Sequence, residues 1–143
     1  MIKTKSKAFV FDFDDTLAFT DARVHVIDWN NQVIASLTPQ EFNSVKLKKG
    51  ESFDFSDFDR ASLILNGTPT KLIDLARDVF SEGHSVFILT ARDNQASSAI
   101  AEFLKGFGVV AKEIHCVGAS NGGGLAKAKL KGVLAVIEHL ELV

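Results

Sequence analysis

Three apolar, β-forming segments separated by segments of helical periodicity constrain the fold of this chain more than any other feature. They are residues 8–13 (AFVFDF), residues 85–90 (SVFILT) and residues 114–117 (IHCV). The first is so apolar that it suits a central strand buried on both faces, and the second is also expected to be buried. Strands that alternate with helices indicate an α/β fold with a parallel sheet.

Three helices are expected around this sheet. One begins at Thr68 and Pro69, ends at Gly83, and has an apolar stripe made of Leu72, Ile73, Leu75, Ala76, Val79 and Phe80. A second ends at Gly106 or Gly108 and is indicated by apolar residues at helical spacing, namely Ala96, Ala99, Ile100, Phe103 and Leu104. A third covers about residues 125–139, after a glycine-rich loop at residues 118–124.

Residues 17–66 form a small insert between the first strand and the first of these helices. Residues 24–27 and 32–35 flank Asn30 and Asn31, which favours a β-hairpin because Asn tolerates positive φ. Thr38, Pro39 and Glu41 match a capped start of a short helix. Residues 51–66 are interpreted as a loop anchored by aromatic side chains, namely Phe53, Phe55 and Phe58.

Composition limits the class of protein. A chain of 143 residues fits a single domain, and a net charge of −2 does not require a nucleic-acid partner. The single cysteine excludes an internal disulfide. No uncharged stretch approaches the roughly 20 residues of a membrane span, and the opening residues lack the apolar run of a signal peptide. We therefore expect a cytoplasmic protein that does not insert into a membrane.

The carboxyl ends of parallel strands are where α/β sheets place their chemistry. Asp12 and Asp14 stand at the end of the first strand on one side of the chain, close enough to share a cation such as Mg²⁺. Thr90 and Arg92 end the second strand, where a hydroxyl and backbone N–H groups can cradle a phosphate. Each signal also has a plain structural interpretation: the acids as loop caps, Thr90 as a helix cap, and the lysines that follow the third strand as solvated side chains, namely Lys127, Lys129 and Lys131.

Taken together and in this order, these signals resemble the haloacid dehalogenase-like hydrolases over nearly the whole chain. Residues 10–17 (VFDFDDTL) resemble the first motif of that superfamily in full, and residues 88–92 (ILTAR) resemble the second. Lys127 best fits the third motif, with Lys129 as the alternative. The resemblance implies a three-layer, Rossmann-like parallel sheet with a small β-hairpin flap and no large cap.

The resemblance also implies a Mg²⁺-dependent phosphatase that acts through an aspartyl-phosphate. Asp12 would be the nucleophile and Asp14 the general acid and base, and both would contribute to the metal site. The phosphate would be bound by Thr16, Thr90, Arg92 and Lys127. The substrate would be a phosphorylated small molecule or a nucleic-acid end.

One departure from the superfamily pattern concerns the fourth motif, an acidic pair after a fourth strand. The sequence ends where that strand should start, and neither Glu138 nor Glu141 is a natural replacement. We therefore expect either a truncated chain or an incomplete metal site. An uncovered first strand would favour self-association, and residues 140–143 are expected to pack beside residues 8–11.

Two further interpretations stay open. The chain could be a catalytically impaired phosphate-binding or structural domain of this superfamily. It could instead be similar to polynucleotide 3′-phosphatases, with lysine contacts to nucleic acid from Lys3, Lys5, Lys7, Lys46, Lys48 and Lys49.

Overall fold

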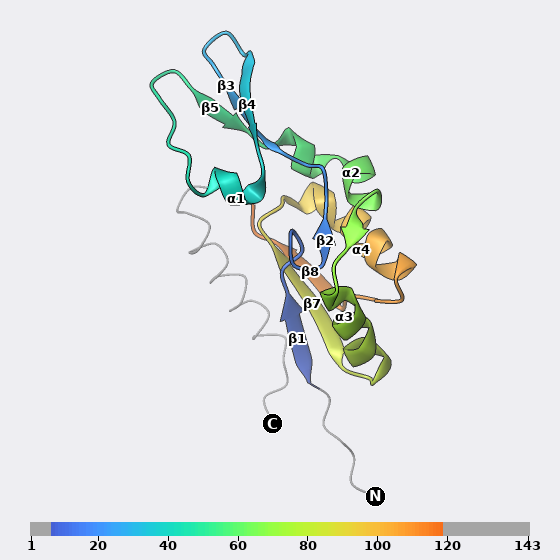
Figure 1. The fold of residues 1–143 in the computed structure, drawn as a ribbon. Coiled ribbons are helices and arrows are strands. Elements are labelled where there is room, and N and C mark those ends of the chain that lie inside the picture. The colour runs from blue at the N-terminus through green and yellow to red at the C-terminus, as the bar shows by residue number, and fades with distance from the viewer. Residues whose placement is uncertain (1–6, 119–143) are drawn as a thin grey trace, which may run out of the picture.

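The parallel sheet expected from the sequence is present with three strands in the computed structural model, which describes residues 7–118 (Figure 1). Strand β7 (Ser85–Thr90) lies between β1 (Ala8–Phe11) and β8 (Glu113–Cys116), and both pairings are parallel. The bounds of β7 are those predicted, while β1 ends before Asp12. All three strands therefore direct their carboxyl ends toward the same edge of the sheet.

Helices pack against one face of this sheet. They are α2 (Ala61–Leu65), α3 (Leu72–Ser81) and α4 (Ser97–Gly106), the last preceded by a 3-10 turn, η2 (Asn94–Ala96). Their buried side chains form a single core with every second residue of β7, Val86 and Ile88. Right-handed crossovers that proceed from β1 to β7 to β8 place both connecting helices on the same face, so this arrangement is expected. The described residues thus form a mixed α/β fold with a parallel sheet.

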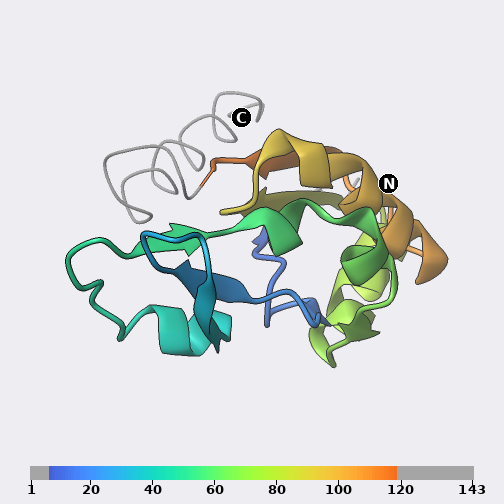
Figure 2. The ribbon, with the colours of Figure 1, turned by 90° about the horizontal axis from the view of Figure 1, so that it is seen from above.

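The insert forms a second, antiparallel sheet with its own apolar cluster. Strand β3 (Val24–Ile27) pairs with β4 (Val33–Leu37) as the predicted hairpin and with β5 (Ser52–Asp54) on its other side. Helix α1 (Pro39–Phe42) follows β4 and has the predicted capping box between Thr38 and Glu41. Figures 1 and 2 show that this unit projects beyond the carboxyl ends of the parallel strands, far from α3.

The interpretation of residues 51–66 as a loop is wrong. This segment contains β5, a 3-10 helix η1 (Ser56–Asp59) and helix α2. The predicted role of the aromatic side chains as anchors is confirmed, because Phe53, Phe55 and Phe58 pack against the buried residues of the insert cluster. The strand was not recognised because its partner, β3, lies far away in the sequence.

The predicted start of a helix at Thr68 and Pro69 is also wrong. Thr68–Pro69 is a short strand, β6, that pairs with β2 (Ala18–Phe19), and helix α3 begins only at Leu72. The Thr70 hydroxyl accepts a hydrogen bond from the Leu72 amide at 3.2 Å, just before the helix begins.

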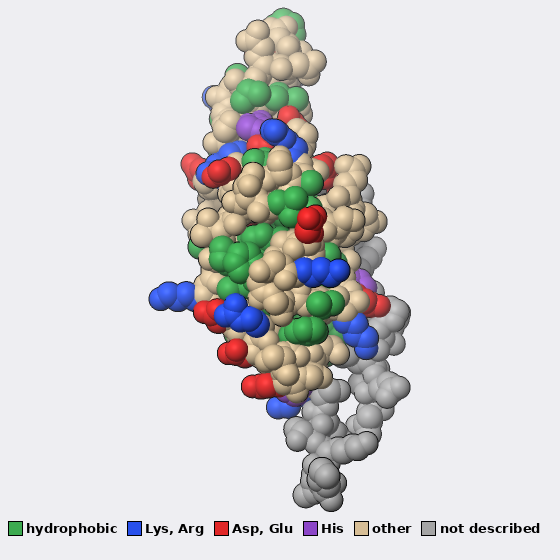
Figure 3. Space-filling view, turned by 90° about the vertical axis from the view of Figure 1, so that its right-hand side faces the viewer, with side chains coloured by type: hydrophobic (Ala, Val, Ile, Leu, Met, Phe, Trp, Pro, Cys, Tyr) green, Lys and Arg blue, Asp and Glu red, His purple; other side chains and the backbone are tan. Residues whose placement is uncertain are grey.

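Two predictions of burial need correction. Leu72 and Leu75 of α3 are 42% and 45% exposed, so the buried stripe of this helix is narrower than predicted. Figure 3 views the side on which α2, α3 and α4 lie in Figure 1, and shows hydrophobic side chains among charged ones of both signs.

The second correction concerns β1. Val10 in this strand is 45% exposed, which contradicts the prediction of a strand buried on both faces. Within residues 7–118, β1 has a strand neighbour on one side, so it is an edge of the described sheet.

Several predictions fall outside the described residues. They concern the helix at residues 125–139, the packing of residues 140–143, the third layer of the sheet and the lysines Lys127 and Lys129. Among helices within residues 7–118, none is long and apolar enough to cross a membrane.

Candidate functional site

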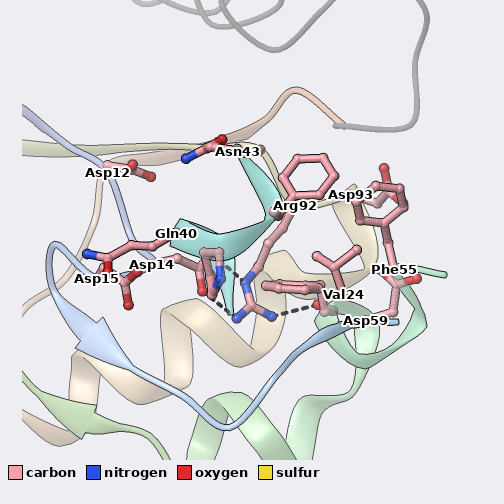
Figure 4. Close-up of a pocket in the computed structure, with 14 residues that line it drawn as sticks. Asp12, Asp14, Asp15, Val24, Gln40, Asn43, Phe55, Asp59, Arg92 and Asp93 are labelled. Carbon is pink, nitrogen blue, oxygen red and sulfur yellow. Dashed lines mark hydrogen bonds and ion pairs between the residues drawn. The ribbon is translucent and has the colours of Figure 1, made fainter. Parts of the chain in front are cut away.

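A pocket of about 280 Å³ lies where the carboxyl ends of β1 and β7 meet the insert (Figure 4). The sheet side contributes Asp12, Asp14, Asp15, Ala91, Arg92 and Asp93, and the insert contributes Val24, Pro39, Gln40, Phe42, Asn43, Phe55, Phe58 and Asp59. Figure 4 shows Asp12, Asp14 and Asp15 on one side of the pocket and Val24, Phe55 and Asp59 on the other. The pocket is therefore acidic at the sheet and largely apolar along the insert.

The backbone after β1 places the first two acids on the pocket side. Phe13 is completely buried in the core beneath the sheet, so Asp12 and Asp14, its neighbours, face the opposite way into the pocket. The loop then turns tightly, because the Phe13 carbonyl accepts hydrogen bonds from the amides of Thr16, Leu17 and Ala18. This confirms that the Asp-x-Asp spacing brings both carboxylates to one pocket.

Asp14 forms a bidentate ion pair with Arg92. The Arg92 Nε donates to one carboxylate oxygen at 2.9 Å and Nη2 donates to the other at 2.6 Å. The Arg92 side chain is only 2% exposed and that of Asp14 is 20% exposed. Paired hydrogen bonds of this kind fix the orientation of a carboxylate, so Arg92 determines where the Asp14 oxygens lie.

Arg92 also joins the sheet to the insert. Its Nη1 donates to the Phe58 carbonyl at 2.7 Å, and its guanidinium lies 4.8 Å from the centre of the Phe58 ring. Its Nη2 lies within weak hydrogen-bonding distance of the Thr20 hydroxyl, at 3.4 Å. The guanidinium donors are thus largely taken up inside the protein, an arrangement that suits a positioning role, while the contact of Arg92 with phosphate stays a prediction.

The charge of the pocket is concentrated on carboxylates. Burial raises the pKa of Asp15, and the neighbouring carboxylates Asp14 and Asp12 raise it further, against a smaller opposite effect of Arg23. Asp15 has φ of 61°, in the left-handed region that Asp and Asn tolerate better than most residues. A cation or a proton that entered this end of the pocket would relieve the repulsion among these groups.

Two of the predicted phosphate-binding residues do not line the pocket. Thr90 is completely buried, and its hydroxyl accepts a hydrogen bond from the Arg92 amide at 3.2 Å. The Thr16 carbonyl accepts a hydrogen bond from the Thr70 hydroxyl, which ties the loop after β1 to the start of α3. Lys127, which was also predicted to bind phosphate, lies outside the described residues.

Most of the pocket-lining residues that the insert contributes were not predicted from the sequence. Asp59 and the rings of Phe42, Phe55 and Phe58 line it, as does Asp93 from the sheet edge. Asp93 follows the second motif directly and could have been found from its place after a strand. The aromatic residues carried no such signal, because Phe42 in α1 and Phe55 and Phe58 near η1 are brought to the pocket by the tertiary arrangement of the insert.

Among residues 7–118, the oxygen atoms at the edge of the sheet suit the binding of Mg²⁺. The Asp12 carboxylate lines the pocket, and within residues 7–118 no hydrogen-bond donor reaches the Asp14 carbonyl oxygen. The same residues contain no group of three ligating side chains. Mg²⁺ commonly binds through one or two carboxylates, keeps several waters and takes further oxygens from a substrate phosphate. The donors present match that mode of binding.

Comparisons with protein-family models, with curated proteins and with solved structures found no significant match to this chain. The resemblance to the haloacid dehalogenase-like hydrolases therefore depends on the motifs at residues 10–17 and 88–92 and on the site geometry described above.

Proposed function

We propose that this chain is a Mg²⁺-dependent phosphohydrolase that acts through an aspartyl-phosphate. The observation that carries the proposal is the placement of Asp12 and Asp14 in one pocket at the carboxyl end of β1. Two carboxylates at this position can divide the work of a nucleophile and of an acid–base group. The motifs that contain them support the same assignment.

The proposed reaction has two steps. In the first, a carboxylate oxygen of Asp12 attacks phosphorus, the bond to the ester oxygen breaks, and Asp14 gives that oxygen a proton. In the second, water attacks the phosphorus of the aspartyl-phosphate, Asp14 takes a proton from the water, and the Asp12 carboxylate leaves. Phosphate and the free alcohol are released, and both side chains return to their starting forms.

The Asp12 carboxylate and the Asp14 carbonyl would hold Mg²⁺, which supplies charge neutralisation for the phosphoryl group when bound. Such neutralisation suits this pocket, because its described lining contains five carboxylates, from Asp12, Asp14, Asp15, Asp59 and Asp93, and one guanidinium.

Arg92 imposes a condition on the first step. Both Asp14 oxygens accept hydrogen bonds from Arg92, a geometry that suits the ionised carboxylate and its role as the base of the second step. For Asp14 to donate a proton, one of these contacts has to open. Phosphate esters whose leaving group needs no proton, such as p-nitrophenyl phosphate, should therefore be hydrolysed most readily.

The test is hydrolysis of p-nitrophenyl phosphate and of an alkyl phosphate with and without Mg²⁺, by the wild type and by Asp12→Asn. The Asn variant keeps the shape of the side chain but cannot form the aspartyl-phosphate, so turnover should be lost while the thermal unfolding transition remains. Asp21→Asn, an exposed aspartate outside the pocket, is the matched control. Undiminished turnover by a folded Asp12→Asn protein would refute the proposal.

A catalytically impaired, phosphate-binding domain is the second candidate. It is favoured by the burial of Thr90 and by the internal contacts of Arg92, which leave few donors for a phosphate among the described residues. Binding of inorganic phosphate without turnover of any ester, measured by calorimetry in the presence of Mg²⁺, would support this candidate against the first.

A nucleic-acid phosphatase is the third candidate. Lys46, Lys48 and Lys49 are exposed in the segment between α1 and β5, and Gly50 there packs against Trp29, which is 79% exposed. Lysines beside an exposed aromatic ring suit a single-stranded nucleic acid. Removal of phosphate from an oligonucleotide end, with binding that weakens steeply as salt is raised, would distinguish this candidate.

A further inference from the structure

The insert side of the pocket is an apolar, aromatic wall. Phe42, Phe55 and Phe58 line it together with Val24 and Pro39. Val24 is only 3% exposed, and the aromatic residues are half-buried. A wall of this composition favours a ligand group that is itself apolar, and aromatic rings favour a flat ring that can stack or meet them edge to face.

The wall is built before any ligand arrives. The rings of Phe42 and Phe55 meet edge to face with centroids 5.5 Å apart, and Phe53 contacts both from within the insert cluster. Phe58 is covered on one side by the guanidinium of Arg92. Side chains held this way lose little conformational entropy when a ligand binds, which favours affinity.

The charges of the pocket set a second condition. Arg92, the one cation among the described lining residues, is already paired with Asp14, whereas Asp59 and Asp93 flank the apolar part. A ligand with a carboxylate on its organic part would meet charges of its own sign there, which is costly in a confined site. An organic part without negative charge meets no such penalty.

From these observations we infer the substrate class, on the basis of the phosphohydrolase proposed above. The pocket takes a small phosphomonoester whose organic part is a flat, aromatic group without negative charge, as in a nucleoside monophosphate. The phosphate lies at the end formed by Asp12 and Asp14, and the ring system lies against Phe42 and Phe55. A volume of about 280 Å³ is at the lower end for small-molecule sites, so it accommodates one such ring system.

The first experiment measures binding of adenosine, which has the ring but no phosphate, by calorimetry. Adenosine should bind the wild type, and Gln40→Trp should abolish this binding because Gln40 lines the pocket and a large side chain there fills it. Gln32→Trp is the matched control, since Gln32 is also exposed but lies in the hairpin turn outside the pocket.

The second experiment compares turnover of adenosine 5′-monophosphate, glucose 6-phosphate and 3-phosphoglycerate with Mg²⁺. The first should have the highest kcat/KM by at least about tenfold. Phe55→Leu, which keeps an apolar side chain but removes the ring, should raise KM for the nucleotide by about 5- to 100-fold and leave kcat within a few-fold.

The outcomes separate this inference from the proposed function. Equal turnover of all three esters, or adenosine binding that survives Gln40→Trp, overturns the inference and leaves the phosphohydrolase in place. Adenosine binding that Gln40→Trp abolishes, without turnover of any ester, supports the aromatic site and overturns the phosphohydrolase. Failure of both binding and turnover overturns both.

Discussion

The parallel sheet and the insert differ in the interactions that stabilise each of them internally. The core beneath the parallel sheet is made of buried apolar side chains, mainly from three helices and from the strands β1, β2 and β7. The separate apolar cluster of the insert has three buried residues, Val24, Val26 and Leu37, and the partly buried residues packed against them are mostly aromatic. Polar contacts supplement them: Asp57 accepts a hydrogen bond from the Arg23 amide at 3.1 Å and contacts the His25 ring at 2.9 Å.

This difference has a consequence for the site that forms between the two regions. Four of the five pocket carboxylates, those of Asp12, Asp14, Asp15 and Asp93, come from the edge of the sheet, whereas the aromatic wall comes from the region with the smaller core. Regions with few buried apolar contacts open locally at a lower free energy than the rest of a protein. We therefore expect the insert to unfold locally more often than the sheet, while the sheet and its carboxylates stay in place.

The largest expected effect is on the sheet core. Ile88→Ala removes a completely buried side chain and should lower the free energy of unfolding by about 2–5 kcal/mol. Leu37→Ala, the matched change in the insert, should cost less and should act locally, because Leu37 belongs to the smaller cluster. Amide hydrogen exchange should accelerate in β3, β4 and β5 of the Leu37 variant while β7 stays protected. Equal loss of protection in both regions would show that they unfold as one unit.

The ion pair between Asp14 and Arg92 at the edge of the sheet should be next in effect. Asp14→Asn leaves the buried guanidinium of Arg92 without a compensating charge, and removal of one partner from such a pair typically costs about 3 kcal/mol. Chemical denaturation should show this loss, while Asp12→Asn should be affected less because an Asn oxygen can still accept the hydrogen bond from the Phe13 amide.

Turnover should also fall in Asp14→Asn, by roughly 10²–10⁴-fold, as is usual for loss of a general acid–base group. A second substitution, Arg92→Met, removes the unpaired charge and should restore part of the stability but none of the turnover. If Asp14→Asn were as stable as Asp12→Asn, the ion pair would not contribute to the stability of the sheet edge.

The two regions also differ in how much of them the sequence predicts. The strand at residues 85–90, the hairpin and the capped start of α1 each follow from local patterns of apolar, turn and capping residues, and they are confirmed. The Asp-x-Asp spacing predicts two carboxylates in one pocket for the same reason, since alternation along an extended chain is a local property.

The rest of the site depends on contacts between residues far apart in the chain. Arg92 reaches Asp14 across 78 positions and Phe58 across 34, so no local pattern could distinguish a positioning side chain from a phosphate ligand. Strands β5 and β6 are too short for a period of two residues to be recognised. The aromatic wall of the pocket was missed because it combines Phe42 from α1 with Phe55 and Phe58 from the segment after β5, and no local pattern relates them.

The thiol of Cys116 gives a smaller effect that reports on the sheet alone. Burial raises the pKa of Cys116 to about 11, and Asp93 adds to the effect against a smaller opposite one from Arg92. An exposed thiol ionises near pH 8.5. Because the thiolate is the reactive form, modification by iodoacetamide at pH 7.5 should be at least about 100-fold slower in the folded protein than in urea. Fast modification of the native protein would mean that the end of β8 opens as readily as the insert.

The smallest expected effect concerns Asp15, beside the pocket. Its pKa is raised in the folded protein by burial and then by Asp14 and Asp12, so the folded state favours the protonated form. The contribution of Asp15 to stability is therefore complete below its unfolded pKa near 3.8 and is lost as pH rises through the folded pKa. At pH 7 the ionised side chain costs stability, which Asp15→Asn should recover. Asn also tolerates the φ of 61° at this position.

Because Asp15 is largely exposed, the rise in Tm of the Asp15→Asn variant should be small, on the order of 1 °C. The difference from wild type should vanish at pH 3, where both side chains are uncharged, whereas Asp21→Asn should show no such pattern. A rise in Tm that persisted unchanged at pH 3 would assign the gain to the backbone conformation and not to the repulsion among the carboxylates.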